Sequence, residues 1–420
     1  MPQTLAQKIL QAHTDDVIER DGQIVQCRLS LVLANDITGP LAIKSFKGMG
    51  ASHVFDKDRI ALVMDHFTPQ KDIASANQVM ISRQFAREQG ITHYYEGGDC
   101  GVEHTLLPER GLVGPGDVVI GADSHTCTYG GIGAFATGMG STDIAAGMAL
   151  GETWIKVPPT IRVNINGRMS RWLRGKDLML LLIKTIGVDG ALYKALEFGG
   201  SVIDALPVEG RLTMANMAIE AGGKVGLFAV DELTRQYCAE HGRPGVTMSL
   251  AADEGAAYER VVDIDVTGQE PVVACPHLPS NVKNVSELKD LPVQQVVVGS
   301  CTNGRISDMR DAAEILRGRK VAKGVRCIIL PSTPAVWKQC LKEGLMDVFM
   351  DAGCIVGPCT CGPCLGGHMG ILGDGERAVA TTNRNFRGRM GSLDSEVYLS
   401  SPVVAAASAV AGCIAGPDQL

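Results

Sequence analysis

The chain has 420 residues, of which 45% are hydrophobic and 20% charged, with a formal net charge of −7. This composition is typical of a globular protein, and the length exceeds what one hydrophobic core usually serves, so we expect two or three domains. The basic residues do not cluster into a stripe and no apolar stretch is long enough to span a bilayer, which argues against a nucleic-acid partner and against a membrane segment.

The first residues, 1–8, lack the basic and apolar regions of a secretory signal. Thirteen cysteines in such a chain indicate reduced thiols or metal ligands rather than a disulfide framework. We therefore expect a cytoplasmic protein that acts on small molecules.

The first part of the chain alternates between strand and helix patterns. Residues 4–13 predict a helix, 23–33 a strand, 59–64 a second strand, and 71–89 a helix that ends at Gly90. Such alternation predicts parallel strands joined by crossover helices.

Polar residues follow two of the apolar strands. Residues 59–64 lead into Asp65 and His66, and the strand at 117–120 leads into Asp123, Ser124 and His125. Ligands gather at the carboxyl ends of strands in open α/β sheets, so these positions suit chemistry. Each group alone would favour turn or cap residues, but together with His104 they favour a functional cluster.

The glycine-rich run 130–140 lacks a phosphate-loop ending and indicates close backbone packing around a site.

Two further units follow the Pro158-Pro159 break. The second has a strand at 160–165 and helices at 176–186 and 211–220; on the last, Asn216 and Glu220 share a face, either as solvated residues or as an inward-facing pair. The predicted domains are 1–158, 159–270 and 271–420.

The third unit places cysteines and arginines in loops between predicted strands and helices. Strand 295–298 leads to Cys301, and the further elements are helix 306–316, strand 327–330, helix 334–352, strand 378–382 and helix 402–412. Arg384 and Arg389 follow strand 378–382 and suit either a carboxylate clamp or a solvated basic loop.

Cys301 and the pair Cys361 and Cys364 suggest an iron–sulfur cluster. A closed [4Fe–4S] cluster takes four thiolates, so three cysteines would leave one iron open to act as a Lewis acid. Three alternatives remain: a thioredoxin-like dithiol at Cys361 and Cys364, a zinc site formed by Cys359, Cys361, Cys364 and His368, or buried cysteines that only pack.

The ordered set of motifs resembles the aconitase superfamily over almost the whole chain. It comprises Asp65-His66, His104, Gly121-Ala-Asp-Ser-His-Thr126, Asn216 with Glu220, Gly299-Ser-Cys-Thr-Asn-Gly-Arg305, Cys361-Gly-Pro-Cys364 and Asn383-Arg-Asn-Phe-Arg-Gly-Arg389. The resemblance implies an α/β fold of three α/β/α domains around one [4Fe–4S] cluster held by Cys301, Cys361 and Cys364. It also implies a hydro-lyase that moves a hydroxyl between neighbouring carbons of a malate-type diacid.

The same resemblance implies roles for the remaining residues. Asp65 and His66 would protonate the departing hydroxide, His104 and Asp123 would form a second such pair, and Ser124 and His125 would line the site. Asn216 and Glu220 would hydrogen-bond a bound water, and Arg384 and Arg389 would hold a substrate carboxylate. The swivelling fourth domain of single-chain members is absent, so a small subunit would supply the catalytic serine and much of the specificity pocket.

Overall fold

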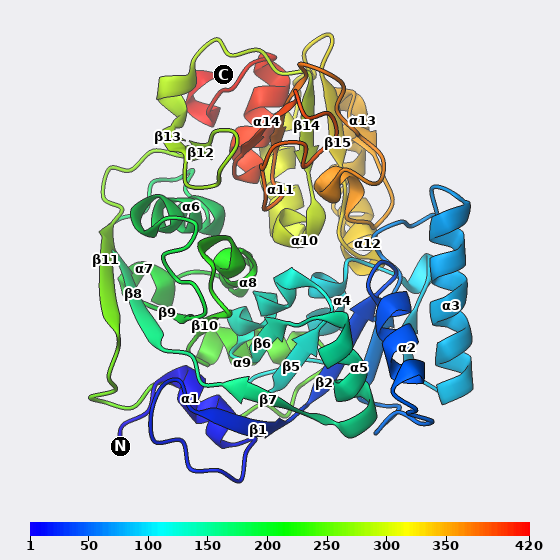
Figure 1. Cartoon of the computed structure of the whole chain (residues 1–420). Helices are drawn as coiled ribbons and strands as arrows, with labels where there is room; N and C mark the ends of the chain where they lie inside the picture. The colour runs from blue at the N-terminus through cyan, green and yellow to red at the C-terminus, as the bar shows by residue number, and fades with distance from the viewer.

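Three sheets organise the computed structural model, which describes residues 1–420 (Figure 1). The first sheet has five parallel strands in the order β4-β3-β2-β5-β6. Its strands are β2 (Leu31–Asn35), β3 (Ile60–Val63), β4 (His93–Tyr95), β5 (Val118–Gly121) and β6 (Phe135–Gly138). Helices α2 (Gly39–Gly48), α3 (Ile73–Gln89) and α5 (Ser141–Leu150) share one hydrophobic core with this sheet, and α4 (Glu103–Glu109) shares another. Both faces are therefore covered, as parallel sheets require.

The second sheet has four parallel strands in the order β10-β9-β8-β11. These are β8 (Thr160–Asn166), β9 (Ala195–Gly199), β10 (Val225–Phe228) and β11 (Arg260–Asp265). Its helices are α6 (Gly175–Ile186), α7 (Ser201–Asp204), α8 (Val208–Asn216) and α9 (Glu232–Glu240). A smaller antiparallel pair, β1 (Ile24–Arg28) and β7 (Glu152–Lys156), lies near helix α1 (Leu5–Gln11) at the bottom of Figure 1.

The third sheet has seven strands, in the order β13-β12-β18-β17-β14-β15-β16. Strands β14 (Gln295–Val298), β15 (Arg326–Ile329), β16 (Ile355–Val356), β17 (Arg377–Ala380) and β18 (Glu396–Leu399) are parallel, and β12 (Val272–Ala274) and β13 (Val282–Asn284) form an antiparallel edge. Its helices are α10 (Ser300–Asn303), α11 (Ile306–Leu316), α12 (Pro334–Lys342), α13 (Leu345–Ala352) and α14 (Pro402–Ala411). The predicted α/β fold is confirmed, and we propose the domains 1–158, 159–270 and 271–420 because each large sheet takes its strands from one of these ranges.

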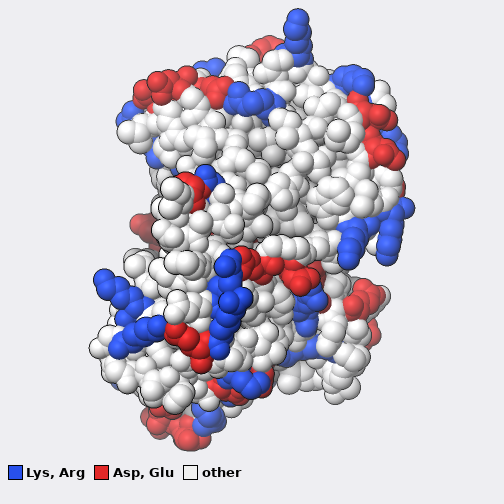
Figure 2. Space-filling view, turned by 90° about the vertical axis from the view of Figure 1, so that its right-hand side faces the viewer, with Lys and Arg blue, Asp and Glu red and all other residues white.

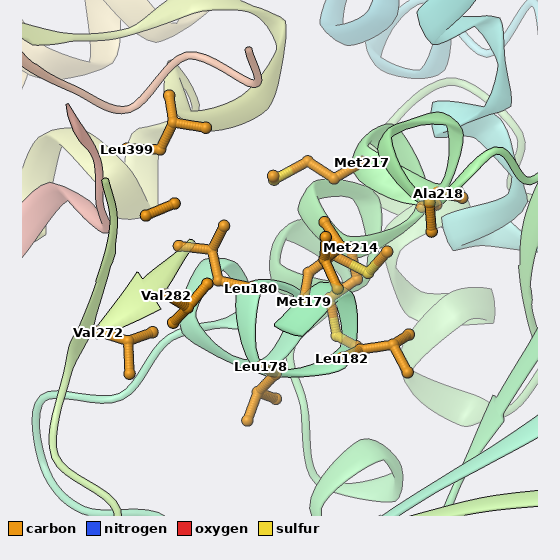
Figure 3. Packing of buried hydrophobic residues seen from close by; sticks show 14 of the residues in the cluster. Leu178, Met179, Leu180, Leu182, Met214, Met217, Ala218, Val272, Val282 and Leu399 are labelled. Carbon is orange, nitrogen blue, oxygen red and sulfur yellow. The ribbon is translucent and has the colours of Figure 1, made fainter. Parts of the chain in front are cut away.

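Helix α6 connects the second and third sheets through one apolar core. Leu180 lies toward Val272 and Leu399 of the third sheet, whereas Met179 and Leu182 lie on the side of Met214 on α8 (Figure 3). All of these side chains are almost completely buried. The packing fixes α8, and with it the residues that follow, relative to the third sheet.

Close backbone contact also joins the first and second sheets, as predicted for the glycine-rich run. The 3-10 helix η2 (Ser124–Ile132) lies against α8, and a Cβ atom at Gly131 would be only 2.7 Å from the Cα of Leu212. Because no side chain fits in that gap, glycine is required there.

Three predicted elements differ from the structure. The strand at 23–33 is two strands, β1 and β2, which belong to different sheets. The helix at 334–352 is divided into α12 and α13 by Gly344, which adopts a left-handed conformation with φ of 70°. The helix at 211–220 ends at Asn216 and continues as the 3-10 helix η3 (Met217–Ala221). Periodicity alone did not reveal these breaks because apolar residues resume directly after each of them.

No helix in the structure combines the length and the apolar character needed to cross a bilayer. On the face shown in Figure 2, basic and acidic side chains lie close to one another, and most of the surface between them is uncharged.

Candidate active site

A cavity of about 260 Å³ lies between the first and third sheets, because all of its lining residues follow or flank elements of these two units. Strands β3 and β5 end beside it at one edge of the first sheet and deliver Asp65 and Asp123, and β14 of the third sheet leads to Cys301. The predicted site residues that line the cavity are Asp65, His66, His104, Asp123, Ser124, His125, Cys301, Cys361, Cys364, Arg384 and Arg389. Asn216 and Glu220 lie directly behind this layer and contact it through hydrogen bonds.

His66 is held between two carboxylates. Its Nδ1 is 2.7 Å from Asp65 Oδ1 and 3.3 Å from Asp36 Oδ1, and the Asp36 carboxylate also accepts the backbone N–H groups of His66 and Phe67. Burial opposes protonation of His66, but the charge of Asp65 and hydrogen bonds to both carboxylates raise its pKa well above the usual value. These contacts favour a protonated imidazole whose Nδ1–H is held by carboxylates and whose Nε2 has Asp123 Oδ2, 3.9 Å away, as a neighbour.

The pKa of His104 is shifted in the opposite direction from that of His66, although His104 is also hydrogen-bonded to a carboxylate. Its Nε2 lies 2.9 Å from Asp123 Oδ1, and its Nδ1 lies 3.1 Å from the hydroxyl of Tyr129. Burial lowers the pKa of His104 despite the hydrogen bond to Asp123. We assign the neutral tautomer with Nε2–H donating to Asp123, because a carboxylate can only accept.

Asp123 joins both histidine groups. Its Oδ1 accepts the backbone N–H of His125 at 2.7 Å, and its Oδ2 lies 3.9 Å from His66 Nε2. Burial raises the pKa of Asp123, but hydrogen bonds from His104 and His125 outweigh burial and hold the pKa well below the usual value. Asp123 thus caps the following 3-10 helix, as its turn interpretation predicted, and also faces the cavity.

A buried ion-pair network holds Glu220 and Arg384. Glu220 Oε1 lies 2.8 Å from His125 Nε2, and Arg384 Nε donates to both carboxylate oxygens, at 2.9 and 3.1 Å. Arg384 Nη2 also donates to Ser124 Oγ at 3.0 Å. Of the two interpretations left open for Glu220, solvated or inward-facing, the structure has the inward-facing one. Arg384 uses two of its nitrogen atoms to donate to Glu220 and Ser124.

Cys301 lies at the centre of several amide donors. Ser300, in a left-handed conformation with φ of 74°, turns the chain from β14 into α10, where Cys301 lies. Asn216 Nδ2 donates to Cys301 Sγ at 3.3 Å and Asn383 Nδ2 at 3.4 Å. Amide donors around a sulfur stabilise thiolate charge, as expected at an iron–sulfur ligand.

Cys361 is the N-cap of the 3-10 helix η5 (Gly362–Leu365), and Cys364 lies within it. Both form an apolar cluster with Cys301 and Val102. Arg389 Nη2 is 4.0 Å from Cys364 Sγ. Burial opposes ionisation of Cys364, but Arg389 and His125 outweigh it and lower its pKa. The three cysteines are thus brought to one wall of the cavity.

The other arrangements of the cysteines receive less support. Cys359 faces a different pocket, and Cys354 packs in the core of the third sheet. No group of ligand atoms within 4.8 Å of one another combines Cys359 with Cys361, Cys364 or His368, so a single tetrahedral zinc ion does not suit them.

Sequence reasoning missed Asp36, Glu103, Tyr129 and Asn383. Asp36 directly follows β2, so recognising the break between β1 and β2 would have shown another acid at a strand end. Glu103 directly precedes the predicted residue His104, and Asn383 is the first residue of the arginine motif. Tyr129 carried no local signal, because only the tertiary packing of η2 against α4 brings its hydroxyl to His104.

Comparison with known proteins places this geometry in a family. The profile of the Aconitase family (aconitate hydratase) matches residues 7–290 and 281–412. A Desulfovibrio desulfuricans protein named 3-isopropylmalate dehydratase large subunit is 84% identical over 420 residues, covering 100% of both chains. A Nitratidesulfovibrio vulgaris protein of the same name is 72% identical over the same lengths. The crystal structure of Thermococcus kodakaraensis aconitase X superposes with a TM-score of 0.49 and 15% identity, covering 90% of this chain and 88% of that one.

Proposed function

Because the chain belongs to the aconitase family, we propose that it is the large subunit of a 3-isopropylmalate dehydratase. This hydro-lyase of leucine biosynthesis interconverts 2-isopropylmalate and 3-isopropylmalate through 2-isopropylmaleate. The observation that carries the proposal is full-length identity of 84% to a relative with that name. The cavity, with its histidine–carboxylate pairs and cysteine wall, is consistent with the chemistry.

The residues present fit an iron–sulfur cluster, the cofactor of this family. Cys301, Cys361 and Cys364 would hold one [4Fe–4S] cluster per subunit, and the amides of Asn216 and Asn383 already point at the Cys301 sulfur. When bound, a cluster with three protein ligands would supply a Lewis-acidic iron for the substrate's hydroxyl and carboxylate. The side chain of Asn216 already hydrogen-bonds Cys301 and Thr302, so it would position the segment that carries Cys301.

The proton chemistry would belong to the two histidine–carboxylate pairs. His66, kept protonated by Asp65 and Asp36, would deliver its Nε2 proton to the hydroxyl oxygen that leaves. His104, neutral and hydrogen-bonded to Asp123, would complete the second pair. The different environments of the two imidazoles would keep them in different protonation states near neutral pH.

The remaining polar groups would orient the diacid. Arg389 has no ion-pair partner in the chain and lines the cavity, so it would hold a substrate carboxylate. Arg384 would present the remaining part of its guanidinium beside Ser124, while Glu220 fixes its position. Ser124 and His125 would complete the wall next to them.

We further propose that a small subunit completes the site, since the relatives are named large subunits. It would supply the serine that removes the carbon-bound proton and most of the pocket for the substrate's variable group. The large subunit alone would then be inactive.

The test is an anaerobic hydratase assay of this chain copurified with its small-subunit partner on isopropylmaleate, homoaconitate, citraconate, dimethylmaleate and cis-aconitate. We expect partner-dependent turnover of isopropylmaleate, its loss in His66→Asn, and its retention in His93→Asn, a matched change on β4 outside the cavity. Preference for another diacid would refute the assigned substrate, and full turnover by the large subunit alone would refute the two-subunit site.

A further inference from the structure

Glu103 lines the cavity but takes no part in the proton transfers described above. It is the first residue of α4, and its side chain is only 1% exposed. Its Oε1 lies 3.2 Å from Asn35 Nδ2, whereas its Oε2 is buried and has no hydrogen-bond partner in the chain. A buried carboxyl oxygen without a partner is unusual and indicates a group that completes its bonding with a ligand.

The hydrogen bonds of Asn35 show which carboxyl oxygen of Glu103 accepts a hydrogen bond and which one is left to carry a proton. Asn35 Oδ1 accepts the backbone N–H groups of Ile37 and Thr38 at 3.1 and 3.0 Å, so Nδ2 must face Glu103 as a donor. Oε1 of Glu103 is therefore an acceptor. In a neutral carboxylic acid the other oxygen, Oε2, would carry the proton.

The surrounding charges favour this neutral form. Asp65 accepts the backbone N–H of Glu103 at 2.8 Å, a carboxylate oxygen of Asp123 lies within 4.8 Å of one of Glu103, and His104 Nε2 is 3.4 Å from Oε1 but donates to Asp123. The cation that acts most strongly on the carboxyl is His66, which is itself held by Asp65 and Asp36. Burial, followed by the charges of Asp65 and Asp123, raises the pKa of Glu103 well above the usual value.

We propose that Glu103 is a neutral carboxylic acid whose Oε2–H donates a hydrogen bond to a carboxylate of the bound diacid. An ionised Glu103 would be a third carboxylate around a ligand that itself brings two, whereas the neutral acid is a donor. The choice of a malate-type diacid rests on the proposed function. The protonation state and the unsatisfied Oε2 do not depend on it.

Two substitutions separate this role from the alternatives. Glu103→Gln keeps an acceptor for Asn35 and places an N–H donor at the Oε2 position, so we expect the KM of the holoenzyme complex to stay within about threefold of wild type. Glu103→Leu removes the donor, so KM should rise roughly 10- to 100-fold, the loss expected for a hydrogen bond to a charged group. Equal damage in both variants, or none in Glu103→Leu, would overturn the proposal.

An infrared difference spectrum tests the proton directly. At about pH 8.5 the wild-type holoprotein should show a protonated-carboxyl C=O band that Glu103→Gln lacks, and isopropylmalate should shift that band. Glu109→Gln is the matched control on the same helix, because the pKa of Glu109 is raised by burial only to about 7 and its carboxyl is ionised at that pH. Absence of the band would overturn the proposal even if the two Glu103 variants do not fold. Failure of the proposed function is recognised separately, as a wild-type complex without isopropylmaleate turnover whose band still shifts with another diacid.

Discussion

Replacing Asp123 with asparagine removes one charge from the centre of the site while keeping its shape. The amide oxygen of asparagine can still accept from His104 Nε2 and from the His125 backbone, and the amide nitrogen takes the place of Oδ2. What is lost is the attraction between the carboxylate and protonated His66, whose Nε2 lies 3.9 Å from Asp123 Oδ2.

The size of that loss follows from the distances. Unit charges about 4 Å apart attract by about 4 kcal/mol at an effective dielectric constant of about 20. Since about 1.4 kcal/mol corresponds to a factor of ten in rate, we expect Asp123→Asn to lower kcat/KM about 10³-fold.

The assay is anaerobic turnover of isopropylmaleate by the complex with the small subunit, with iron content measured on the same samples. Asp123 is not among the proposed cluster ligands, so iron content should equal that of wild type. Asp117→Asn is the matched control, because Asp117 immediately precedes the same strand but pairs with Arg243 outside the cavity. A loss in Asp123→Asn smaller than about tenfold, with intact iron, would refute the electrostatic role of this carboxylate.

Three further predictions concern the pH dependence, the cluster ligands and the packing. Activity that needs protonated His66 should fall as pH rises through the raised pKa of this group, so Asp36→Asn should move the alkaline limb of the kcat profile to lower pH, by about one unit or more. Cys361→Ser should lose iron on anaerobic purification, whereas Cys354→Ser should retain it, because Cys354 packs in the core of the third sheet. Gly131→Ala should reduce the free energy of unfolding by about 1–3 kcal/mol, measured by thermal denaturation, because its Cβ would meet the α8 backbone.

Each of these has a matched control or a contrary outcome. An unchanged alkaline limb in Asp36→Asn would show that His66 is not the proton donor. Iron retained in Cys361→Ser but lost in Cys359→Ser would replace the proposed ligand set. Gly98→Ala is the packing control, since a Cβ at Gly98 meets no atom within 4 Å and should leave thermal stability unchanged.

The sequence was sufficient to predict the parts of the site that lie at strand ends. Asp65, Asp123 and Cys301 each follow a strand whose apolar run is easy to recognise, and parallel strands place such residues at one edge of a sheet. The predicted α/β class follows from the same alternation. The assignment of Cys361 and Cys364 over Cys359 came from the family motif, because spacing alone leaves several ligand sets open.

What could not be predicted depends on tertiary contacts between distant segments. Glu220 was recognised as a partner of Asn216 on one helix face, yet the chain changes to a 3-10 helix after Asn216 and the two side chains reach different groups. The pairing of Glu220 with Arg384 joins residues 164 positions apart. Likewise, the contrast between protonated His66 and neutral His104 arises from buried neighbours such as Asp36, whose proximity no local pattern shows.

The most direct test of the central claim is metal analysis of the wild-type chain purified without oxygen. If Cys301, Cys361 and Cys364 hold a [4Fe–4S] cluster, the protein should be brown and contain about four iron and about four sulfide per chain. Adding isopropylmalate with the small subunit should then change the spectroscopic signature of the open iron. A colourless protein with about one zinc per chain, or a metal-free protein with a reducible Cys361–Cys364 disulfide, would contradict the account.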